Sequence, residues 1–148
     1  MKGLLQIVIL AFAMSACKNN TPVVCEETEI VAPKIILIIG QSNTHYGLGL
    51  NETLDAPESG IYQLGRFKNN KCVIQACEPL DHHTKADGAI GFGLTFGKLY
   101  KQSLQIPSDL ILVPCGFGGT GFADNRWNKT NDLYEDAVSR VNGLMVEY

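Results

Sequence analysis

An apolar run that ends in a polar turn constrains the fold of this chain more than any other feature. Residues 34–40 read KIILIIG, and QSNTHYG follows directly. A segment that is apolar and β-branched at nearly every position is typical of a strand covered on both faces of a parallel sheet. We therefore expect a buried strand that presents Ser42 at its carboxyl end, where a serine is either a nucleophile or an ordinary turn residue.

Two further segments have the composition of strands. Residues 109–115, DLILVPC, predict a second buried strand that ends at Cys115, which we expect to be a buried apolar residue. Residues 61–76 contain two short β-prone runs around Asn69 and Asn70, and this pattern predicts a hairpin inserted beside the sheet.

Two segments have the periodicity of helices. Residues 91–104 predict an amphipathic helix whose large apolar side chains recur at helical spacing: Phe92, Phe96, Leu99 and Tyr100. A second helix is expected over residues 132–146, where Asp132 and Glu135 have the spacing of a capping box. Its apolar stripe comprises Leu133, Ala137, Val141, Leu144 and Met145. The alternation of buried strands and amphipathic helices predicts an α/β layered fold with a βαβ unit.

Ligands of such folds bind at the carboxyl ends of the strands, where this chain has the segments GQSNTHYG and GFGGTGF. If the two strands are neighbours, Ser42 and residues 118–121 face one crevice. Glycines allow backbone N–H groups to turn inward, so the second segment is suited to form an oxyanion hole for acyl transfer.

The glycine segment has two other interpretations. Gly116, Gly118 and Gly121 spell the dinucleotide-binding pattern G-x-G-x-x-G behind a strand. That pattern requires a helix that opens at the glycines and an acidic residue that ends a second strand. Here loop-like residues follow, and the acidic residues lie on the predicted helix. In the other interpretation the glycines only form a tight loop.

The amino terminus has the features of an export signal. Lys2 precedes the apolar stretch GLLQIVILAFAM, which is too short for a transmembrane span, and MSAC follows. MSAC resembles the bacterial lipobox, although Met14 stands where Leu is usual. It predicts a lipoprotein signal peptide over residues 1–16 and a lipid on Cys17, which would anchor the protein to a membrane of the bacterial cell envelope, at the outer membrane or the periplasmic face. A plain secretory signal is the alternative.

Residues 17–33 are polar and acidic with two prolines, and they predict a flexible tether before a domain over residues 34–148. The chain length of 148 residues fits one domain. A net charge of −3 without a Lys/Arg run argues against nucleic acid as a partner.

Four cysteines besides Cys17 leave three full pairings open: they are Cys25, Cys72, Cys77 and Cys115. The segment VIQA between Cys72 and Cys77 reads as a strand, which separates their Cα atoms by about 16 Å and excludes a bond between them. The spacings match no zinc pattern. We expect neither a metal ion nor a cofactor.

Four motifs together resemble one enzyme family. They are GQSN after the first strand, EPLDHH in a loop, GFGLTFGKLY at the start of a helix, and LVPCGFGGTGF. In this order they resemble the sialate O-acetylesterase-like branch of the SGNH hydrolases, over about residues 34–146. The resemblance implies a three-layer, flavodoxin-like fold with a central parallel sheet, of which this chain holds the amino-terminal portion.

The resemblance also implies roles for individual residues. Ser42 matches the nucleophile that attacks an acetyl ester on a carbohydrate. Gly119 matches the backbone donor to the oxyanion, with Gly118 beside it. Gln41 and Asn43 flank the nucleophile and are expected to support its loop.

The general base of the family is missing from this chain. Family members carry a Gln-Gly-Glu block after the next strand and an Asp-x-x-His motif near the end, and neither occurs before Tyr148. A serine hydroxyl is a weak nucleophile without a base. His45 and the pair His82 and His83, beside Asp81, are local candidates to replace it. Adjacent residues of an extended segment point opposite ways, so at most one of the pair faces the pocket.

Two classes of function therefore stay open. The first is the amino-terminal part of a lipid-anchored carbohydrate acetylesterase, truncated before its base and inactive as it stands. The second is a non-catalytic carbohydrate-binding or vestigial lipoprotein module. In either class Tyr46 and Trp127 are candidate surfaces for stacking against a sugar ring.

Overall fold

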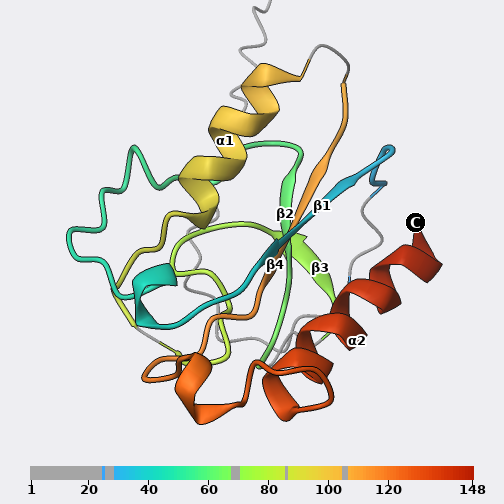
Figure 1. The fold of residues 1–148 in the computed structure, drawn as a ribbon. Coiled ribbons are helices and arrows are strands. Elements are labelled where there is room, and N and C mark those ends of the chain that lie inside the picture. The colour runs from blue at the N-terminus through green and yellow to red at the C-terminus, as the bar shows by residue number, and fades with distance from the viewer. Residues whose placement is uncertain (1–24, 26–28, 68–70, 86, 105–106) are drawn as a thin grey trace, which may run out of the picture.

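The computed structural model describes Cys25 and residues 29–67, 71–85, 87–104 and 107–148 (Figure 1). It contains four strands, two α-helices and two short 3₁₀ helices. In chain order these are β1 (Lys34–Ile38), η1 (Ser42–Thr44), β2 (Ile61–Leu64), β3 (Val73–Gln75), α1 (Gly93–Ser103), β4 (Leu110–Pro114), η2 (Phe122–Asp124) and α2 (Asp132–Glu147).

The four strands form one mostly parallel sheet in the order β1-β4-β2-β3. β4 pairs in parallel with both β1 and β2, and β3 pairs antiparallel with β2. The first and second buried strands are therefore neighbours, which is the condition for Ser42 and residues 118–121 to face one crevice. The predicted hairpin of β2 and β3 is also confirmed, but β2 is an integral strand of the main sheet rather than an insertion beside it. Asn69 and Asn70 lie outside the described residues.

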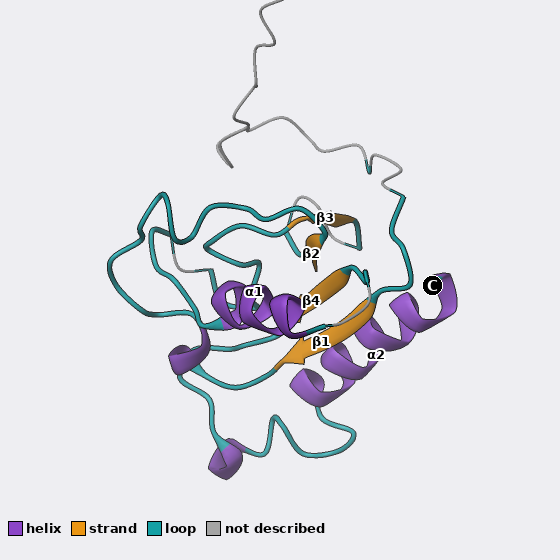
Figure 2. Ribbon diagram, turned by 90° about the horizontal axis from the view of Figure 1, so that it is seen from above, coloured by secondary structure: helices purple, strands orange, loops and turns teal. Residues whose placement is uncertain are grey.

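Two hydrophobic clusters fill the two faces of the sheet. Successive residues of a strand point to opposite faces, so β4 sends Leu110 and Leu112 into one cluster and Ile111 and Val113 into the other. Leu94 of α1 belongs to the first cluster, and helix α2 contributes to the second through Ala137 and Leu144. Figure 2 shows α1 and α2 on opposite sides of β1 and β4. The three-layer α/β architecture predicted from the sequence is correct.

Helix α1 forms as predicted but packs through a different face. The predicted apolar side chains are exposed, with Phe96 47% and Leu99 63% accessible. The buried positions are Gly93, Leu94 and Gly97. A Cβ atom on Gly93 would lie 2.6 Å from the side chain of Ile38, so the glycine allows the helix backbone to approach the sheet closely.

Strand β1 differs from the fully buried strand that its composition predicts. It lies at the edge of the sheet and pairs with β4 alone among the described strands. Leu37 and the following Ile39 are 39% and 54% exposed, and together with Phe92 and Phe96 they line a shallow apolar hollow. β4, which has a strand on each side, is buried at every position. An apolar sequence therefore indicates a central strand for β4 but not for β1.

Helix α2 begins at Asp132, as predicted, without the expected capping box. The N-cap is Asn131, and no side chain caps the first turn. The Asp132 carboxylate instead pairs with the Arg126 guanidinium, with one nitrogen–oxygen distance of 3.1 Å. Of the predicted apolar stripe, Leu133, Ala137 and Leu144 are buried, whereas Met145 is 67% exposed.

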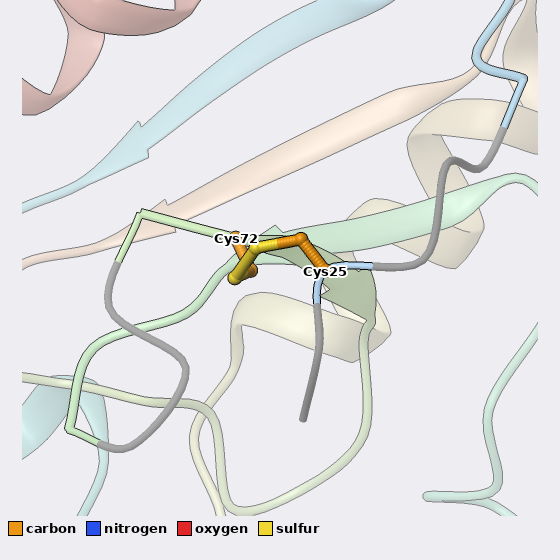
Figure 3. The surroundings of a disulfide bond; sticks show 2 residues. All are labelled: Cys25 and Cys72. Atoms are coloured by element: carbon orange, nitrogen blue, oxygen red, sulfur yellow. A yellow bond between two sulfur atoms is a disulfide. The ribbon is translucent and has the colours of Figure 1, made fainter. Parts of the chain in front are cut away.

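A disulfide bond and a hydrogen bond connect the segment before β1 to the rest of the domain. Cys25 forms a disulfide bond with Cys72, the residue before β3, with the Cα atoms 5.4 Å apart (Figure 3). Farther along, the Val31 N–H donates to Asp109 Oδ2 over 2.8 Å. The sequence left the cysteine pairing open. Cys115 is a free, fully buried thiol, in agreement with its predicted role.

The predicted signal peptide and the lipid-bearing Cys17 lie outside the described residues. Among the residues that are described, no helix is both long enough and apolar enough to cross a membrane.

Candidate active site

The loops that follow β1 and β4 lie side by side at one end of the sheet. The strand pairing continues past both strand ends: the Cys115 N–H donates to Ile38 O over 2.8 Å, and the Phe117 N–H donates to Gly40 O over 2.9 Å. In Figure 1 the short helix η1 and the loop after β4 accordingly lie at the same end of the sheet. The Ser42 loop and the glycine loop thus form the two sides of one site.

Ser42 is the first residue of η1 and is partly exposed. The Ser42 carbonyl accepts hydrogen bonds from the His45 N–H over 3.1 Å and the Tyr46 N–H over 2.9 Å, which closes a tight turn around the serine. Gly40 before it has φ = +144°, and a Cβ there would lie 2.8 Å from the Thr44 methyl group. Only glycine fits this position without strain, and it allows the chain to turn sharply out of the sheet.

The glycine loop presents one N–H group and uses another internally. Gly119 is exposed and has φ = +74°, with no atom near the position of a Cβ. The Gly118 N–H instead donates to Thr84 Oγ1 over 2.6 Å. In this structure Gly118 is therefore already paired, whereas the N–H groups of Gly119 and Ser42 make no hydrogen bond to a described residue. Of the two glycines predicted as oxyanion donors, Gly119 is the one with a free donor.

The glycine loop does not have the geometry of a dinucleotide site. After Gly121 the chain forms the short helix η2 and then a loop, and α2 begins only at Asp132. A dinucleotide fingerprint needs a helix that opens at the glycines to hold the pyrophosphate. That interpretation of Gly116, Gly118 and Gly121 is wrong.

None of the histidines contacts the Ser42 hydroxyl. Within the described residues Ser42 Oγ makes no hydrogen bond, so the structure shows no local base for it. His45 and His82 are 2% and 0% exposed and stack on each other, with ring centroids 4.5 Å apart. His83 turns the other way and packs against the Phe117 ring. The two adjacent rings thus have different partners: His82 stacks on His45, and His83 packs against Phe117.

Asp81 does not orient a catalytic histidine either. The Asp81 carboxylate accepts the Arg66 N–H over 3.0 Å, and its own N–H donates to Gln63 Oε1. No group of three or more His, Cys, Asp or Glu side chains suited to a metal ion occurs among the described residues.

The Arg66 guanidinium contacts the end of β4, directly before the glycine loop. Arg66 forms two hydrogen bonds to the Asp136 carboxylate, at 3.1 and 2.8 Å, and also contacts Pro114 O and Cys115 Sγ at the end of β4. Burial alone would raise the pKa of Asp136, but the Arg66 guanidinium outweighs it and holds this pKa below its usual value. Burial raises the pKa of the Cys115 thiol, so this cysteine remains protonated and structural.

The remaining candidate site residues differ in their exposure and in their contacts. The side chains of Gln41 and Asn43 are exposed and form no hydrogen bond within the described part of the chain. Trp127 packs against the cluster under α2 and donates its indole N–H to Thr120 Oγ1 over 3.1 Å, so it serves packing. Tyr46 is 46% exposed, and its ring lies beside Gly118 at the rim of the site.

Residues 32–147 match the sequence profile of a single family, described as carbohydrate esterase, sialic acid-specific acetylesterase. The chain belongs to this family. Solved structures agree in fold: NanS superposes with a TM-score of 0.68 and 22% identity, over 81% of this chain and 51% of NanS. A protein from Arabidopsis thaliana superposes with a TM-score of 0.62 and 26% identity, over 76% of this chain and 52% of that protein. The fold is therefore the SGNH-type α/β fold.

The chain spans about half the length of these two solved proteins. No protein of curated function matches it.

Several residues that shape the site have no obvious signal in the sequence. Thr84 holds the glycine loop and Arg66 holds the end of β4 before it, both from segments far away in the chain, and neither belongs to a pattern that predicts this role. Thr44 and Gly116 belong to the motifs, but no motif predicts the contact between them. Their contacts depend on how the two loops meet.

Proposed function

We propose that this chain supplies the nucleophile and the oxyanion-binding loop of a carbohydrate O-acetylesterase. The observation that carries the proposal is the placement of Ser42 beside the glycine loop, through the hydrogen bond of the Phe117 N–H to Gly40 O. Membership of the sialic acid-specific acetylesterase family supports an acetylated carbohydrate as the substrate.

In this reaction Ser42 Oγ attacks the carbonyl carbon of an acetyl ester, and its proton passes to a general base. The carbonyl oxygen becomes an oxyanion, which the N–H groups of Gly119 and Ser42 are available to stabilise. Such donors typically contribute about 10²–10³-fold in rate. The tetrahedral intermediate then breaks its bond to the sugar oxygen, which takes up the proton from the base and becomes a hydroxyl, and water hydrolyses the acetyl-Ser42 ester to acetate and free Ser42.

The general base is the part of this mechanism that the described residues do not supply, because none of the three histidine side chains hydrogen-bonds to the Ser42 hydroxyl. We propose that it comes from a further segment, as the Asp-x-x-His motif does in the family. Two observations support this: the solved relatives are about twice as long as this chain, and the apolar side chains of β1 are exposed at the sheet edge. The chain of residues 1–148 is then nearly inert on its own.

Hydrolysis of p-nitrophenyl acetate and of acetylated sugars tests the proposal. We expect a rate near background for the chain alone, and a gain of several powers of ten when a downstream Asp-x-x-His segment is attached. In the extended protein Ser42→Ala should abolish the gain, since loss of a triad member costs about 10⁴–10⁶-fold. Ser103→Ala is the matched control, because Ser103 lies exposed on α1 and donates only to Tyr100 O.

A second function fits the same structure. The absence of a base contact at Ser42, within the described residues, favours a non-catalytic carbohydrate-binding or vestigial module as the alternative. If the extended protein is silent on every ester while the chain binds acetylated sugars, this alternative replaces the esterase. If the chain alone hydrolyses esters, and both Ser42→Ala and His45→Ala abolish the activity, a local base exists and the need for a further segment is refuted.

A further inference from the structure

The tautomer of His45 follows from the hydrogen bonds of Thr44. Thr44 Oγ1 lies 2.7 Å from Gln41 O and 2.6 Å from His45 Nδ1. A hydroxyl has a single proton, and two acceptors cannot approach so closely without one between them. The hydroxyl proton therefore points to Gln41 O, and the proton between Thr44 and His45 belongs to the imidazole. His45 carries its proton on Nδ1, which leaves Nε2 bare.

The tautomer of His82 is the opposite one. The Gly116 N–H donates to His82 Nδ1 over 2.9 Å. A backbone N–H can only donate, so Nδ1 of His82 is the unprotonated nitrogen and Nε2 carries the proton. The Nε2 atoms of both rings are buried without a partner among the described residues.

The two rings connect the two loops of the site at a crowded junction. They stack at 4.5 Å with an interplanar angle of 16°. Gly116 lies beside the Nδ1 atoms of both rings: a Cβ there would be 2.0 Å from Thr44 Oγ1 and 2.9 Å from Nδ1 of each histidine. His45 is bonded through its backbone to the Ser42 carbonyl, and His82 is bonded to the first residue of the glycine loop.

We propose that His45 and His82 are positioning residues, a neutral stacked pair with complementary tautomers that fixes the Ser42 loop relative to the glycine loop. Neither ring touches the reacting atoms. The pair sets the separation between the nucleophile and the oxyanion donor through the Thr44 hydroxyl on one side and the Gly116 N–H on the other. The role that we assign to the pair rests on the proposed function, whereas the geometry of the pair does not depend on that function.

The surroundings of the pair keep both rings neutral. Burial lowers the pKa of His45, and burial, with the neighbouring His45 and the charge of Arg66, lowers the pKa of His82 to about 3. A second proton on His82 would have to enter Nδ1, where the Gly116 N–H already points. Asp136 and Arg126 interact with the neighbouring His83, and the carboxylate of Asp81, the residue before His82, accepts the Arg66 backbone N–H.

Nitrogen NMR of the full chain tests the tautomers without any variant. We expect the protonated nitrogen at pH 7 to be Nδ1 in His45 and Nε2 in His82, with the His82 ring remaining neutral down to about pH 5. The same tautomer in both rings, or a charged His82 ring at pH 6, overturns the proposal.

Two variants of His82 test the positioning role by amide hydrogen exchange. His82→Asn keeps an acceptor near the place of Nδ1 but removes the stacked ring. His82→Phe keeps a ring but removes the acceptor. We expect His82→Asn to speed exchange of the His45 and Tyr46 N–H groups while Gly116 remains protected, and His82→Phe to do the reverse. The faster exchange of Gly116 in His82→Phe should be roughly tenfold, because one hydrogen bond is lost.

Lys85→Ala, an exposed change in the same segment, is the control and should alter neither loop. Unchanged protection of Leu112 in β4 shows that a variant is folded. If both variants loosen both loops equally, or neither does, the pair is only packing and the proposal fails. Failure of Ser42→Ala to affect hydrolysis overturns the proposed function instead, and leaves the exchange result as an independent readout.

Discussion

At the scale of single residues, Gly119 and Gly121 lie in one loop but have different backbone requirements. Gly119 has φ = +74°, whereas Gly121 has the extended value of −162°, and neither has an atom near the place of a Cβ. We expect Gly119→Ala to lower the free energy of unfolding by about 1 kcal/mol or more, through backbone strain alone. It should also lower any Ser42-dependent rate, because the loop relieves the strain by turning the N–H of residue 119 away.

Gly121→Ala is the matched control and should leave both stability and rate unchanged. Urea unfolding and ester hydrolysis by the extended protein measure the two effects. Equal behaviour of the two variants would show that the conformation of Gly119 has no part in the site.

The buried His82 makes stability depend on pH. Burial lowers its pKa in the folded protein to about 3, well below the usual histidine value of 6.5, so the unfolded chain binds more protons at acidic pH. The stability that this difference provides is complete above pH 6.5. It is lost as the pH falls toward 3, at up to about 1.4 kcal/mol per pH unit.

Denaturant unfolding at pH 7, 6 and 5 should therefore show a falling free energy of unfolding, and His82→Asn should have a flatter profile. His45 also has a lowered pKa and contributes in the same direction, so some slope remains in the variant. Parallel profiles for the two proteins would contradict the assignment of the slope to His82.

The sequence predicts single residues well where the signal is local. Ser42 and the loop glycines were found because a strand, a turn and a glycine run are contiguous patterns. The His45–His82 stack was not, because the two residues come from distant segments and meet only when β1 and β4 are paired. The role of Gly116 is hidden for the same reason: no φ value demands a glycine there, only the space that Thr44 and the histidines occupy.

At the scale of elements, the exposed apolar side chains of α1 and β1 predict self-association. Leu37, Phe92 and Phe96 are 39%, 53% and 47% exposed beside a strand edge without a partner in the described sheet. Such edges favour pairing with another chain. We expect Phe96→Glu to shift the protein toward the monomer in sedimentation analysis, and to change the free energy of unfolding by less than about 0.5 kcal/mol.

Thr95→Glu, which adds the same charge at an exposed polar position of α1, should leave the association unchanged. A wild-type chain that is monomeric at all concentrations would contradict the prediction. It would also weaken the proposal that a further segment covers this edge.

Helix α1 shows that a sequence can predict the presence of a helix without predicting which of its faces packs. The period of 3.6 residues identified the helix, because large apolar residues recur along it whichever face packs. The period could not reveal that two glycines and one leucine make the contact with the sheet. Close approach of a helix to a sheet favours small residues, and these contribute little to a hydrophobic pattern.

At the scale of the whole molecule, the fold and the family were predicted from the order of four motifs, whereas the cysteine pairing was not. The Cys25–Cys72 bond joins two cysteines that are 47 positions apart in the sequence. Spacing excluded only the Cys72–Cys77 bond, and the choice among the other bonds depends on where β3 lies relative to the segment before β1. Disulfide bonds persist in oxidising compartments, which agrees with the export signal predicted for residues 1–16.

The same compartment is required by the lipid anchor that MSAC predicts, and we expect Cys17 to be the attachment point. Mass spectrometry of the membrane fraction should detect an acylated peptide that begins at Cys17, without residues 1–16. Cys17→Ala should move the protein to the soluble fraction, because a diacyl anchor adds about 0.8 kcal/mol of membrane affinity per buried methylene group. Cys115→Ala is the matched control, since this buried free thiol has no role at a membrane. An unmodified Cys17 peptide, or equal amounts of wild type and Cys17→Ala in the soluble fraction, would instead indicate a plain secretory signal, and the domain would then act on its carbohydrate away from the membrane.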